Sequence, residues 1–437
     1  MSVTMEKIVS LCKRRGFVFP SSEIYGGISS CWDFGPMGVE LKNNIKKLWW
    51  KEMVQIRENI VGLDAAIIMS PKVWQASGHL EAGFADILVE CKECHHRFKL
   101  EDLRKREIEK CPDCGGELTK GRKFNLMMQT YVGPTQEESA KTYLRAETCQ
   151  GIYVNFKNVS QTMRKKIPFG IAQVGKAFRN EITPGNFIFR TREFEQAEMQ
   201  WFCQPEKADQ WLEYWREERS KWYDKIGLKE ENVRIRKQTK EELPHYAKAA
   251  YEVEYKFPFG WDEFEGIHHR GDWDLSRHSK FSGEDLSYFD EKTKKKYIPY
   301  IIETSLGIDR LALVLLLDAY HEEMVRKEKR VVLKLNKELA PLKVAILPLV
   351  RNKKEIVRKA REVYDLLKSQ FMSIYDDTGS IGRLYRRQDE IGTPYCLTID
   401  FDTLKDKKVT VRDRDTMKQE RVAIDQLIEF LNKKLGE

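Results

Sequence analysis

The chain has 437 residues, of which 41% are hydrophobic and 33% are charged, and its formal net charge is +8. This length and composition predict an ordinary soluble protein of two or three domains, and the mild positive charge permits a polyanionic partner without requiring one. The longest apolar run, Leu311–Leu317, is far too short to span a bilayer, and the first residues lack the apolar core of a signal peptide. We therefore expect a cytoplasmic protein that does not insert into a membrane.

The N-terminal part predicts two helices and a strand. Residues 4–15 have amphipathic spacing, and a turn-rich stretch then leads into a long helix at about 39–58. An apolar run at 65–69 indicates a strand that ends before Pro71. These elements could belong to the core or form a subunit interface.

Four of the nine cysteines form two Cys-x-x-Cys pairs separated by 16 residues, namely Cys91, Cys94, Cys111 and Cys114. Two such turns can direct four thiolates at one point, which is the ligand set of a tetrahedral zinc site. A site with four protein ligands is closed, so we expect structural zinc and assign His95 and His96 to the surface. The five scattered cysteines are expected to be buried, reduced thiols: Cys12, Cys31, Cys149, Cys203 and Cys396.

A hairpin is predicted between Gln173 and Phe202. A first strand ends in Phe-Arg-Asn-Glu at 178–181, a Thr-Pro-Gly-Asn turn follows at 183–186, and a return strand is expected from Phe187. Both faces of the return strand mix aromatic and charged residues. This pattern favours a cavity in which arginines bind phosphate and an aromatic ring stacks on a base, although an exposed hairpin with solvated ion pairs is the alternative.

Two further segments carry charges in unusual places. Glu147 precedes a predicted helix, where it could cap that helix or enter a site. The stretch 257–275 crowds Trp261, Glu263, Arg270, Asp272 and Asp274 among glycines, and it predicts either a functional loop or a polar surface turn. By contrast, the tryptophan-rich helix at 206–227 is expected to pack in the core, and 229–250 is expected to be a solvated insertion.

A strand at 300–304 is predicted to lead through a Ser-x-Gly turn into an apolar helix at 308–317. Glu303 and Arg310 are charges embedded in this hydrophobic segment, so they should be paired or functional. A structural Glu303–Arg310 ion pair is one possibility. In the other, Arg310 lies in the first turn of the helix and reaches an anionic ligand.

Residues 321–341 are predicted to be a helical linker, followed by a separate mixed α/β domain. Arg383, Arg386 and Arg387 cluster with Tyr385 on a predicted helix at 382–389, which would suit either a nucleic-acid surface or a solvated face. The predicted strands of this domain are 344–349, 374–376, 395–401 and 409–413, and its other helices are 353–371 and 425–435.

In chain order, the segment before Pro71, the Arg179–Glu181 hairpin and the strand–helix with Arg310 resemble motifs 1, 2 and 3 of class II aminoacyl-tRNA synthetases. Longer stretches are similar to the homodimeric glycyl-tRNA synthetase family: LRAETCQGIYVNF, VGKAFRNEI, FRTREFEQAE, EFEGIHHRGDWDL, ETSLGIDR and YRRQDEIGTPYCLTIDFD. The resemblance extends over essentially the whole chain.

This resemblance implies an α+β fold. It implies a class II antiparallel sheet flanked by helices at 1–335, a zinc-ribbon-like insertion at 88–122 and a mixed α/β anticodon-binding domain at 341–437. It also implies a homodimer, held partly through motif 1. The implied reaction joins glycine and ATP, with Mg²⁺, into glycyl-adenylate and pyrophosphate, and then transfers glycine to tRNA(Gly).

The resemblance also assigns site residues. Arg179 would bind the α-phosphate and the glycine carboxylate, Arg310 the γ-phosphate, and Phe194 the adenine ring, and Glu303 joins the two arginines as a catalytic group. The implied ATP-binding residues are Arg179, Asn180, Glu181, Phe189, Arg190, Phe194, Glu263, Phe264, Gly307, Asp309 and Arg310, with Glu263 holding Mg²⁺ or ATP. The implied glycine-binding residues are Arg97, Glu147, Phe194, Gln196, Glu198, Arg270, Glu303 and Ser305.

Two other functions remain in competition. A class II synthetase for proline, threonine or serine would need a different pocket, and the acidic residues around Arg270 disfavour it. An accessory subunit without catalysis should have lost the motif arginines or acids, which this chain retains. The departures from the expected family pattern are Ala146, Cys149 and the His268–His269 pair, and we see no segment that would form an editing domain.

Overall fold

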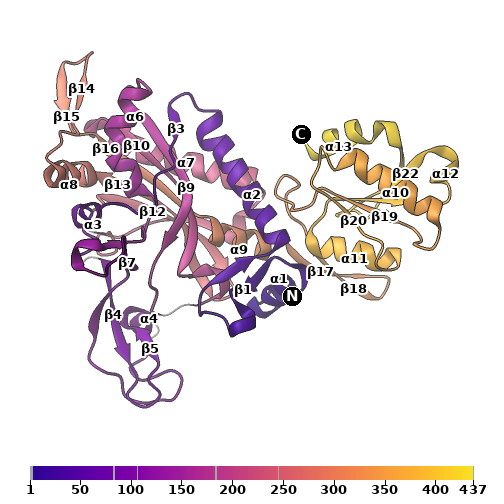
Figure 1. Ribbon diagram of the computed structural model, residues 1–437, viewed down its shortest axis with the longest axis horizontal. Helices are drawn as coiled ribbons and strands as arrows, with labels where there is room; N and C mark the ends of the chain where they lie inside the picture. The colour runs from indigo at the N-terminus through magenta and orange to yellow at the C-terminus, as the bar shows by residue number, and fades with distance from the viewer. Residues whose placement is uncertain (1–2, 82–83, 106, 183–184, 245, 437) are drawn as a thin grey trace.

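The computed structural model describes residues 3–81, 84–105, 107–182, 185–244 and 246–436. The chain forms a large body built on a seven-stranded sheet and a C-terminal body built on a five-stranded sheet. In Figure 1 the C-terminal body, in orange and yellow, lies beside the larger body, and the cysteine-containing segment around β4 and β5 projects away from it.

The large sheet is antiparallel except at one edge, where β3 runs parallel to β9. Its pairing brings together strands from distant parts of the chain, because β10 pairs with β9 on one side and with β16 on the other. In spatial order the strands are β11 (Val233–Lys237), β12 (Ala249–Phe257), β13 (Gly260–Gly271), β16 (Tyr300–Gly307), β10 (Glu193–Cys203), β9 (Phe169–Phe178) and β3 (Ile60–Gly62).

Helices cover the two faces of this sheet unequally. Ala197, Met199 and Trp201 of β10 face the larger core, which α1 (Met5–Arg15), α2 (Pro36–Trp50), α7 (Ala208–Lys225) and α9 (Ile308–Ala319) also line. Phe202 belongs to a smaller core on the other face. That core includes residues of α5 (Cys149–Val154), α6 (Phe156–Thr162) and α8 (Trp273–Ser282).

Small elements surround the large sheet. The cysteine-containing segment has a three-stranded sheet of β4 (Ala85–Glu90), β5 (Arg97–Lys99) and β6 (Arg122–Asn125), with α4 (Leu100–Lys105). The remaining elements are α3 (Pro71–Ala76) and the pairs β1 (Val18–Pro20) with β2 (Trp32–Phe34), β7 (Gln129–Tyr131) with β8 (Lys141–Tyr143), and β14 (Tyr288–Asp290) with β15 (Lys295–Tyr297).

The C-terminal body has parallel and antiparallel strands in one sheet, as the sequence predicts. Its spatial order is β20 (Ser373–Tyr375), β19 (Val344–Pro348), β21 (Tyr395–Ile399), β22 (Lys408–Asp413) and β23 (Gln419–Ala423). Its helices are α10 (Lys354–Leu367), α11 (Ile381–Ile391), α12 (Thr403–Asp406) and α13 (Leu427–Leu435).

A buried charge cluster joins the two bodies. Arg330, fully buried on the hairpin of β17 (Tyr320–Val325) and β18 (Glu328–Leu333), donates to Asp389 of α11 at 2.8 Å, and Arg412 also binds Asp389. Because Arg412 and Asp389 belong to the same body, the bond from Arg330 is the part of this cluster that links the two bodies.

Several predicted elements are wrong in position or type. The run 65–69 is not a strand, because Arg145 and Gln173 bond the backbone of Ala65 instead, and Pro71 begins α3 in the first-turn position that suits proline. The return strand of the hairpin begins at Glu193, since Asn186 and Phe187 adopt positive φ and residues 187–189 form a short 3₁₀ turn. The first half of the predicted turn, residues 183–184, lies outside the described residues.

Three charged segments expected outside the sheet are strands. The predicted insertion at 229–250 contains edge strand β11, where Arg234 and Arg236 pair with glutamates of β12. The stretch 260–271 is a central strand, β13, rather than a loop. The predicted helical linker at 321–341 is instead the β17–β18 hairpin, whose tip residues Arg326 and Lys327 have the positive φ of a tight hairpin turn.

Candidate active site

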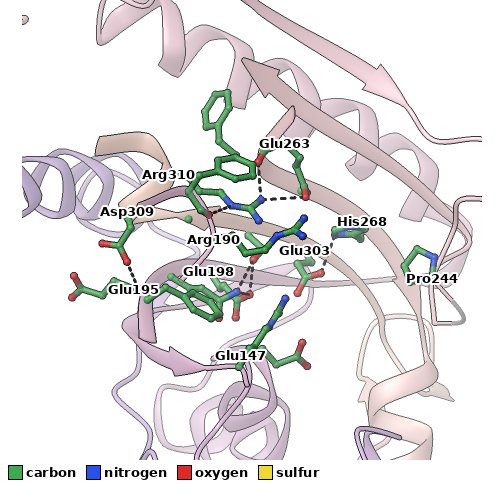
Figure 2. Close-up of a pocket in the computed structure, with 18 of the residues that line it drawn as sticks. Glu147, Arg190, Glu195, Glu198, Pro244, Glu263, His268, Glu303, Asp309 and Arg310 are labelled. Atoms are coloured by element: carbon green, nitrogen blue, oxygen red, sulfur yellow. Dashed lines mark hydrogen bonds and ion pairs between the residues drawn. The ribbon is translucent and has the colours of Figure 1, made fainter. Parts of the chain in front are cut away.

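A cavity of about 370 Å³ opens over β10, β13 and β16, beside Arg179 at the end of β9. Strand pairing brings its walls together: Glu198 of β10 is opposite Ser305 of β16, and Gln200 is opposite Glu303. Because side chains alternate along a strand, Gln196, Glu198 and Gln200 face this side while Ala197 and Met199 enter the core behind the sheet. Figure 2 shows Arg310 and Glu263 at one side of the cavity and Glu147 at the opposite side.

Three buried carboxylates form the acidic end of the cavity: Glu147, Glu198 and Glu303 are 8%, 2% and 3% exposed. Glu198 accepts hydrogen bonds from Ser305 Oγ at 2.6 Å, from Gln196 Nε2 at 3.1 Å and from the Thr148 hydroxyl. All of these donors are neutral. The charge of Glu198 is therefore not balanced by its hydrogen-bond partners.

Glu147 lies beside the start of α5, where its Oε1 accepts from Cys149 Sγ at 3.0 Å and Gln150 Nε2 at 2.9 Å. Its other oxygen lies 3.5 Å from His79 Nε2. Of the two alternatives for Glu147, the structure favours a carboxylate that lines the cavity, held by the first residues of α5.

Arg270 is the buried cation of the acidic end. Its guanidinium donates twice to Asp274, at 2.7 and 3.0 Å, and once to Glu303 at 3.1 Å. Tyr246 lies over the guanidinium, 3.9 Å from ring centroid to Cζ. Glu303 also accepts from Gln200 Nε2 at 3.0 Å and lies 3.0 Å from His268 Nδ1. Of the two alternatives for Glu303 and Arg310, the ion pair between them is not formed, because Arg270 is the partner of Glu303.

These surroundings give two neighbouring carboxyl groups opposite pKa shifts. Burial raises the pKa of Glu198 to about 7, and the negative charges of Glu303 and Glu147 add to the effect. Burial acts in the same direction on Glu303, but Arg270 and His268 outweigh it and lower the pKa of Glu303 to about 2. Burial also opposes ionisation of Glu147, yet the contacts with His79 and Arg270 hold its pKa well below the usual value.

The opposite end of the cavity is cationic and aromatic. Arg310 Nε donates to the Phe189 carbonyl at 3.1 Å, its NH1 donates to the Glu263 carbonyl at 2.7 Å, and its guanidinium lies over the Phe189 ring. Arg179 is held by the Ala146 carbonyl at 3.1 Å, with its guanidinium 5.4 Å from the centre of the Phe194 ring. Arg190 and Glu181 also line the cavity. Several cations beside aromatic faces suit a nucleoside polyphosphate.

The structure brings most of the predicted site residues to this cavity, and two of them lie elsewhere. Arg97 is exposed on β5, where it binds Glu90 at 2.8 Å, so its predicted substrate contact is not present in this structure. Asn180 is not among the cavity-lining residues, and its backbone N–H donates to Leu126. Phe264 borders the cavity, but its ring packs into the core against Tyr223.

Several cavity residues were missed by sequence reasoning. Gln238, Glu242, Pro244 and Tyr246 come from the segment predicted to be a solvated insertion. The sequence pattern that marks them is weak, since polar residues near glycines and prolines occur in most surface loops. Thr148, whose hydroxyl donates a hydrogen bond to Glu198, lies within the LRAETCQG stretch, but no distinctive spacing marks it in the sequence.

The four predicted zinc ligands converge in the cysteine-containing segment. Their Sγ atoms all lie within 4.8 Å of one another, with Cys91–Cys114 at 3.4 Å and Cys94–Cys111 at 3.6 Å. The backbone N–H groups of Glu93 and Cys94 point to Cys91 Sγ. These distances fit tetrahedral thiolates around one zinc ion, for which Zn–S is about 2.3 Å. Four of the five other cysteines are buried as predicted, and Cys31 is half-buried.

Comparison with known proteins identifies the family. Residues 129–320 match the family model of the tRNA synthetase class II core domain (G, H, P, S and T), and residues 343–434 match that of the anticodon binding domain. The glycine--tRNA ligase of Treponema denticola is 54% identical over 98% of this chain and 96% of its own length. Those of Caldanaerobacter subterraneus subsp. tengcongensis and Thermobifida fusca are 53% and 52% identical, each covering 100% of this chain and 99% of their own.

The chain belongs to the glycine--tRNA ligase family. The class II core match includes Arg179, Glu198, Arg270 and Arg310, so the cavity lies within the catalytic core of a glycine--tRNA ligase. The C-terminal body is its anticodon-binding domain. Within the described residues, every helix is too short or too polar to cross a membrane.

Proposed function

We propose that this chain attaches glycine to tRNA(Gly) at the expense of ATP, through a glycyl-adenylate intermediate. The observation that carries this proposal is a single cavity with arginines beside aromatic rings at one end and three buried carboxylates at the other. The first end suits the triphosphate and base of ATP, and the second suits the ammonium of a small amino acid. A cavity of about 370 Å³ has room for both reactants.

The cationic end would carry the adenylation step. In this step a glycine carboxylate oxygen attacks the α-phosphorus of ATP and pyrophosphate leaves. Two anions must approach each other, and negative charge builds on the phosphoryl oxygens, so positioned cations supply most of the catalysis. Arg179 would bind the α-phosphate and the glycine carboxylate together, while Arg190 and Arg310 would hold the γ-phosphate.

The base and the metal ion have separate partners in this proposal. Phe194 would stack on adenine, and Glu181 would contact its edge. ATP enters class II synthetases with Mg²⁺, which neutralises the phosphate charge, and Glu263 is the carboxylate at this end that could hold the ion. Arg310 lies 3.7 Å from Glu263 Oε2, so the binding of Mg²⁺ by Glu263 would leave Arg310 available to the γ-phosphate.

The acidic end would recognise glycine through its ammonium. Glu147, Glu198 and Glu303 surround the position, with Ser305 and Gln196 beside it. Thr148 and Gln196 engage Glu198, and Cys149 and Gln150 engage Glu147, so the walls are fixed by hydrogen bonds rather than mobile. Exclusion of a methyl group by such walls discriminates more strongly than the ~1–3 kcal/mol that a lost methylene contact supplies. Arg270 would act through Glu303, and it would meet the glycine carboxylate if Asp274 released it.

The proposal also assigns a role to each part of the chain. Residues 1–335 would form the catalytic domain, 88–122 the zinc-containing insertion and 341–437 the anticodon-binding domain. The four cysteines would hold structural Zn²⁺, since four thiolates leave no open position for catalysis. A reducing cytoplasm would keep these thiolates available, and the enzyme would act there as a homodimer.

The direct test is aminoacylation. The purified chain should transfer radiolabelled glycine to a tRNA(Gly) transcript when ATP and Mg²⁺ are present, and it should not do so when ATP is omitted. A tRNA transcript specific for serine is the matched control. Charging of tRNA with serine, threonine or proline in place of glycine would support one of the other class II synthetases and refute this assignment.

A further inference from the structure

Lys42 is a buried lysine of α2 that contacts two carboxylates lining the cavity, Glu195 of β10 and Asp309 of α9. It is 8% exposed, and its Nζ lies 2.9 Å from Glu195 Oε2, is hydrogen-bonded to Asp309 Oδ1, and lies over the Phe34 ring at 4.0 Å. Burial opposes the charge of Lys42, but the two carboxylates outweigh it and raise its pKa. Lys42 therefore stays protonated at neutral pH.

Asp309 also bonds directly to the backbone of Glu195. Asp309 Oδ2 accepts a hydrogen bond of 2.8 Å from the Glu195 backbone N–H, which ties the start of α9 to the start of β10. Figure 2 shows Glu195 and Asp309 beside each other and apart from Glu303. Both carboxylates contact the same Nζ, so without this cation they would repel each other and separate these chain segments.

Each of these two carboxylates is adjacent in the chain to a residue proposed to bind ATP. Glu195 directly follows Phe194, the proposed adenine platform, and Asp309 directly precedes Arg310, the proposed γ-phosphate ligand. The glycine end depends on other contacts, because Glu198 is held by Thr148, Gln196 and Ser305, and Glu303 by Arg270 and Gln200. A change at Lys42 should therefore act on one end of the cavity.

We infer that Lys42 is a positioning residue for ATP: it holds Glu195 and Asp309 together from α2, and so sets the separation of Phe194 and Arg310. Lys42 itself does not touch the nucleotide in this inference. A misplacement of about 1 Å in such groups is enough to weaken binding and slow a reaction that depends on alignment. The inference rests on the proposed role of the cavity in glycine adenylation.

Lys46 provides a matched control on the same helix. It is one turn further along α2 and binds Glu195 Oε1 at 3.1 Å, but its side chain is 29% exposed and Asp309 is not its partner. Lys42→Met and Lys46→Met thus each remove one positive charge that contacts Glu195. According to our inference, only the first separates Glu195 from Asp309.

The experiment measures glycine-dependent ATP–pyrophosphate exchange in the full chain, with the KM for ATP and the KM for glycine determined separately. Lys42→Met should raise the KM for ATP by about tenfold or more while the KM for glycine stays within about twofold, and Lys42→Arg should recover most of the loss. Lys46→Met should leave both constants within about twofold of wild type. Equal increases in both constants, an unchanged KM for ATP, or no recovery by Lys42→Arg would overturn the inference.

Asp309→Asn tests the same link if Lys42→Met does not fold, as judged by its thermal midpoint. It should raise the KM for ATP selectively. If Lys42→Met does fold, the effects of the two changes in the double variant should be less than additive. A selective effect on glycine or full additivity would contradict the link. Failure of the proposed function is distinguishable, because the wild-type chain would then show no glycine-dependent exchange at all.

Discussion

Arg270 and Glu303 form an ion pair in the floor of the cavity, with NH1 and Oε2 3.1 Å apart and both side chains 3–4% exposed. This pair makes two adjacent carboxylates unequal. The positive charge of Arg270 lowers the pKa of Glu303 and favours its ionised form. Glu198 has only neutral hydrogen-bond donors, and burial together with the negative charges of Glu303 and Glu147 raises its pKa. A cationic ligand would balance the charge of Glu198, and in the proposed function the glycine ammonium is that ligand.

The unequal pair predicts the pH dependence of glycine use. The pKa of Glu198 is raised to about 7, so the free enzyme loses the Glu198 charge as the pH falls below that value. The kcat/KM for glycine should therefore decline below about pH 7, approaching a tenfold loss per pH unit, and reach a plateau above it. A pyrophosphate-exchange profile from pH 5.5 to 8.5 measures this, and a profile flat across pH 7 would contradict the assignment.

Removal of the Glu198 charge should weaken glycine and spare ATP. Glu198→Gln keeps the shape of the side chain, so the KM for glycine should rise by about 10–100-fold because an ion pair to the ammonium is lost. The bend near pH 7 should also disappear. Glu193→Gln is the control on the same strand, since Glu193 is exposed and pairs with Lys176 on the surface. Glycine constants that change equally in both variants would disprove a specific role for Glu198.

Arg179 should be required for adenylation and dispensable for tRNA binding. Arg179→Ala should lower glycine-dependent exchange by about 10³-fold or more, because it removes the cation proposed to stabilise charge at the α-phosphate. Retention of tRNA on a filter should stay near wild type, since the anticodon-binding domain is remote from the change. Lys176→Ala, at an exposed position of β9 three residues earlier, should leave exchange intact. Substantial exchange in the Arg179 variant would refute its phosphate role.

The cysteine cluster should contain about one zinc ion per chain. Cys111→Ser removes a thiolate from the cluster and should lower the zinc content to a small fraction of that value. Cys31→Ser should retain full occupancy, because Cys31 lies outside the cluster. Elemental analysis of the wild-type chain and both variants, purified without added chelator, measures the zinc content per chain. A wild-type chain without zinc, or a Cys111 variant with full zinc, would show that the four cysteines are not its ligands.

Sequence reasoning predicted the segments whose local pattern matches their final environment. The apolar helix at α9, the tryptophan-rich face of α7 and the alternating elements of the C-terminal domain each follow from periodicity that tertiary contacts do not reverse. The cluster of four cysteines was equally visible, since its spacing encodes its geometry.

The errors arose where long-range pairing determined the structure. The charged residues of β11 and β13 resemble loops in sequence, yet Arg234 and Arg236 are neutralised by glutamates of a neighbouring strand. For the same reason the sequence left the partner of Glu303 open, with Arg310 as one possibility, whereas β13 brings Arg270 to it across the sheet. Tyr246 and Lys42 have no local signal, because their roles depend on which distant side chains they meet.

The central claim is that this cavity selects glycine for adenylation. ATP–pyrophosphate exchange measured with glycine, alanine, serine, threonine and proline in parallel tests it most directly. We predict exchange with glycine at a kcat/KM at least about 10³-fold above that of every other amino acid, because the fixed walls around Glu198 exclude a side chain. Exchange with alanine or serine, but not with glycine, would contradict the account.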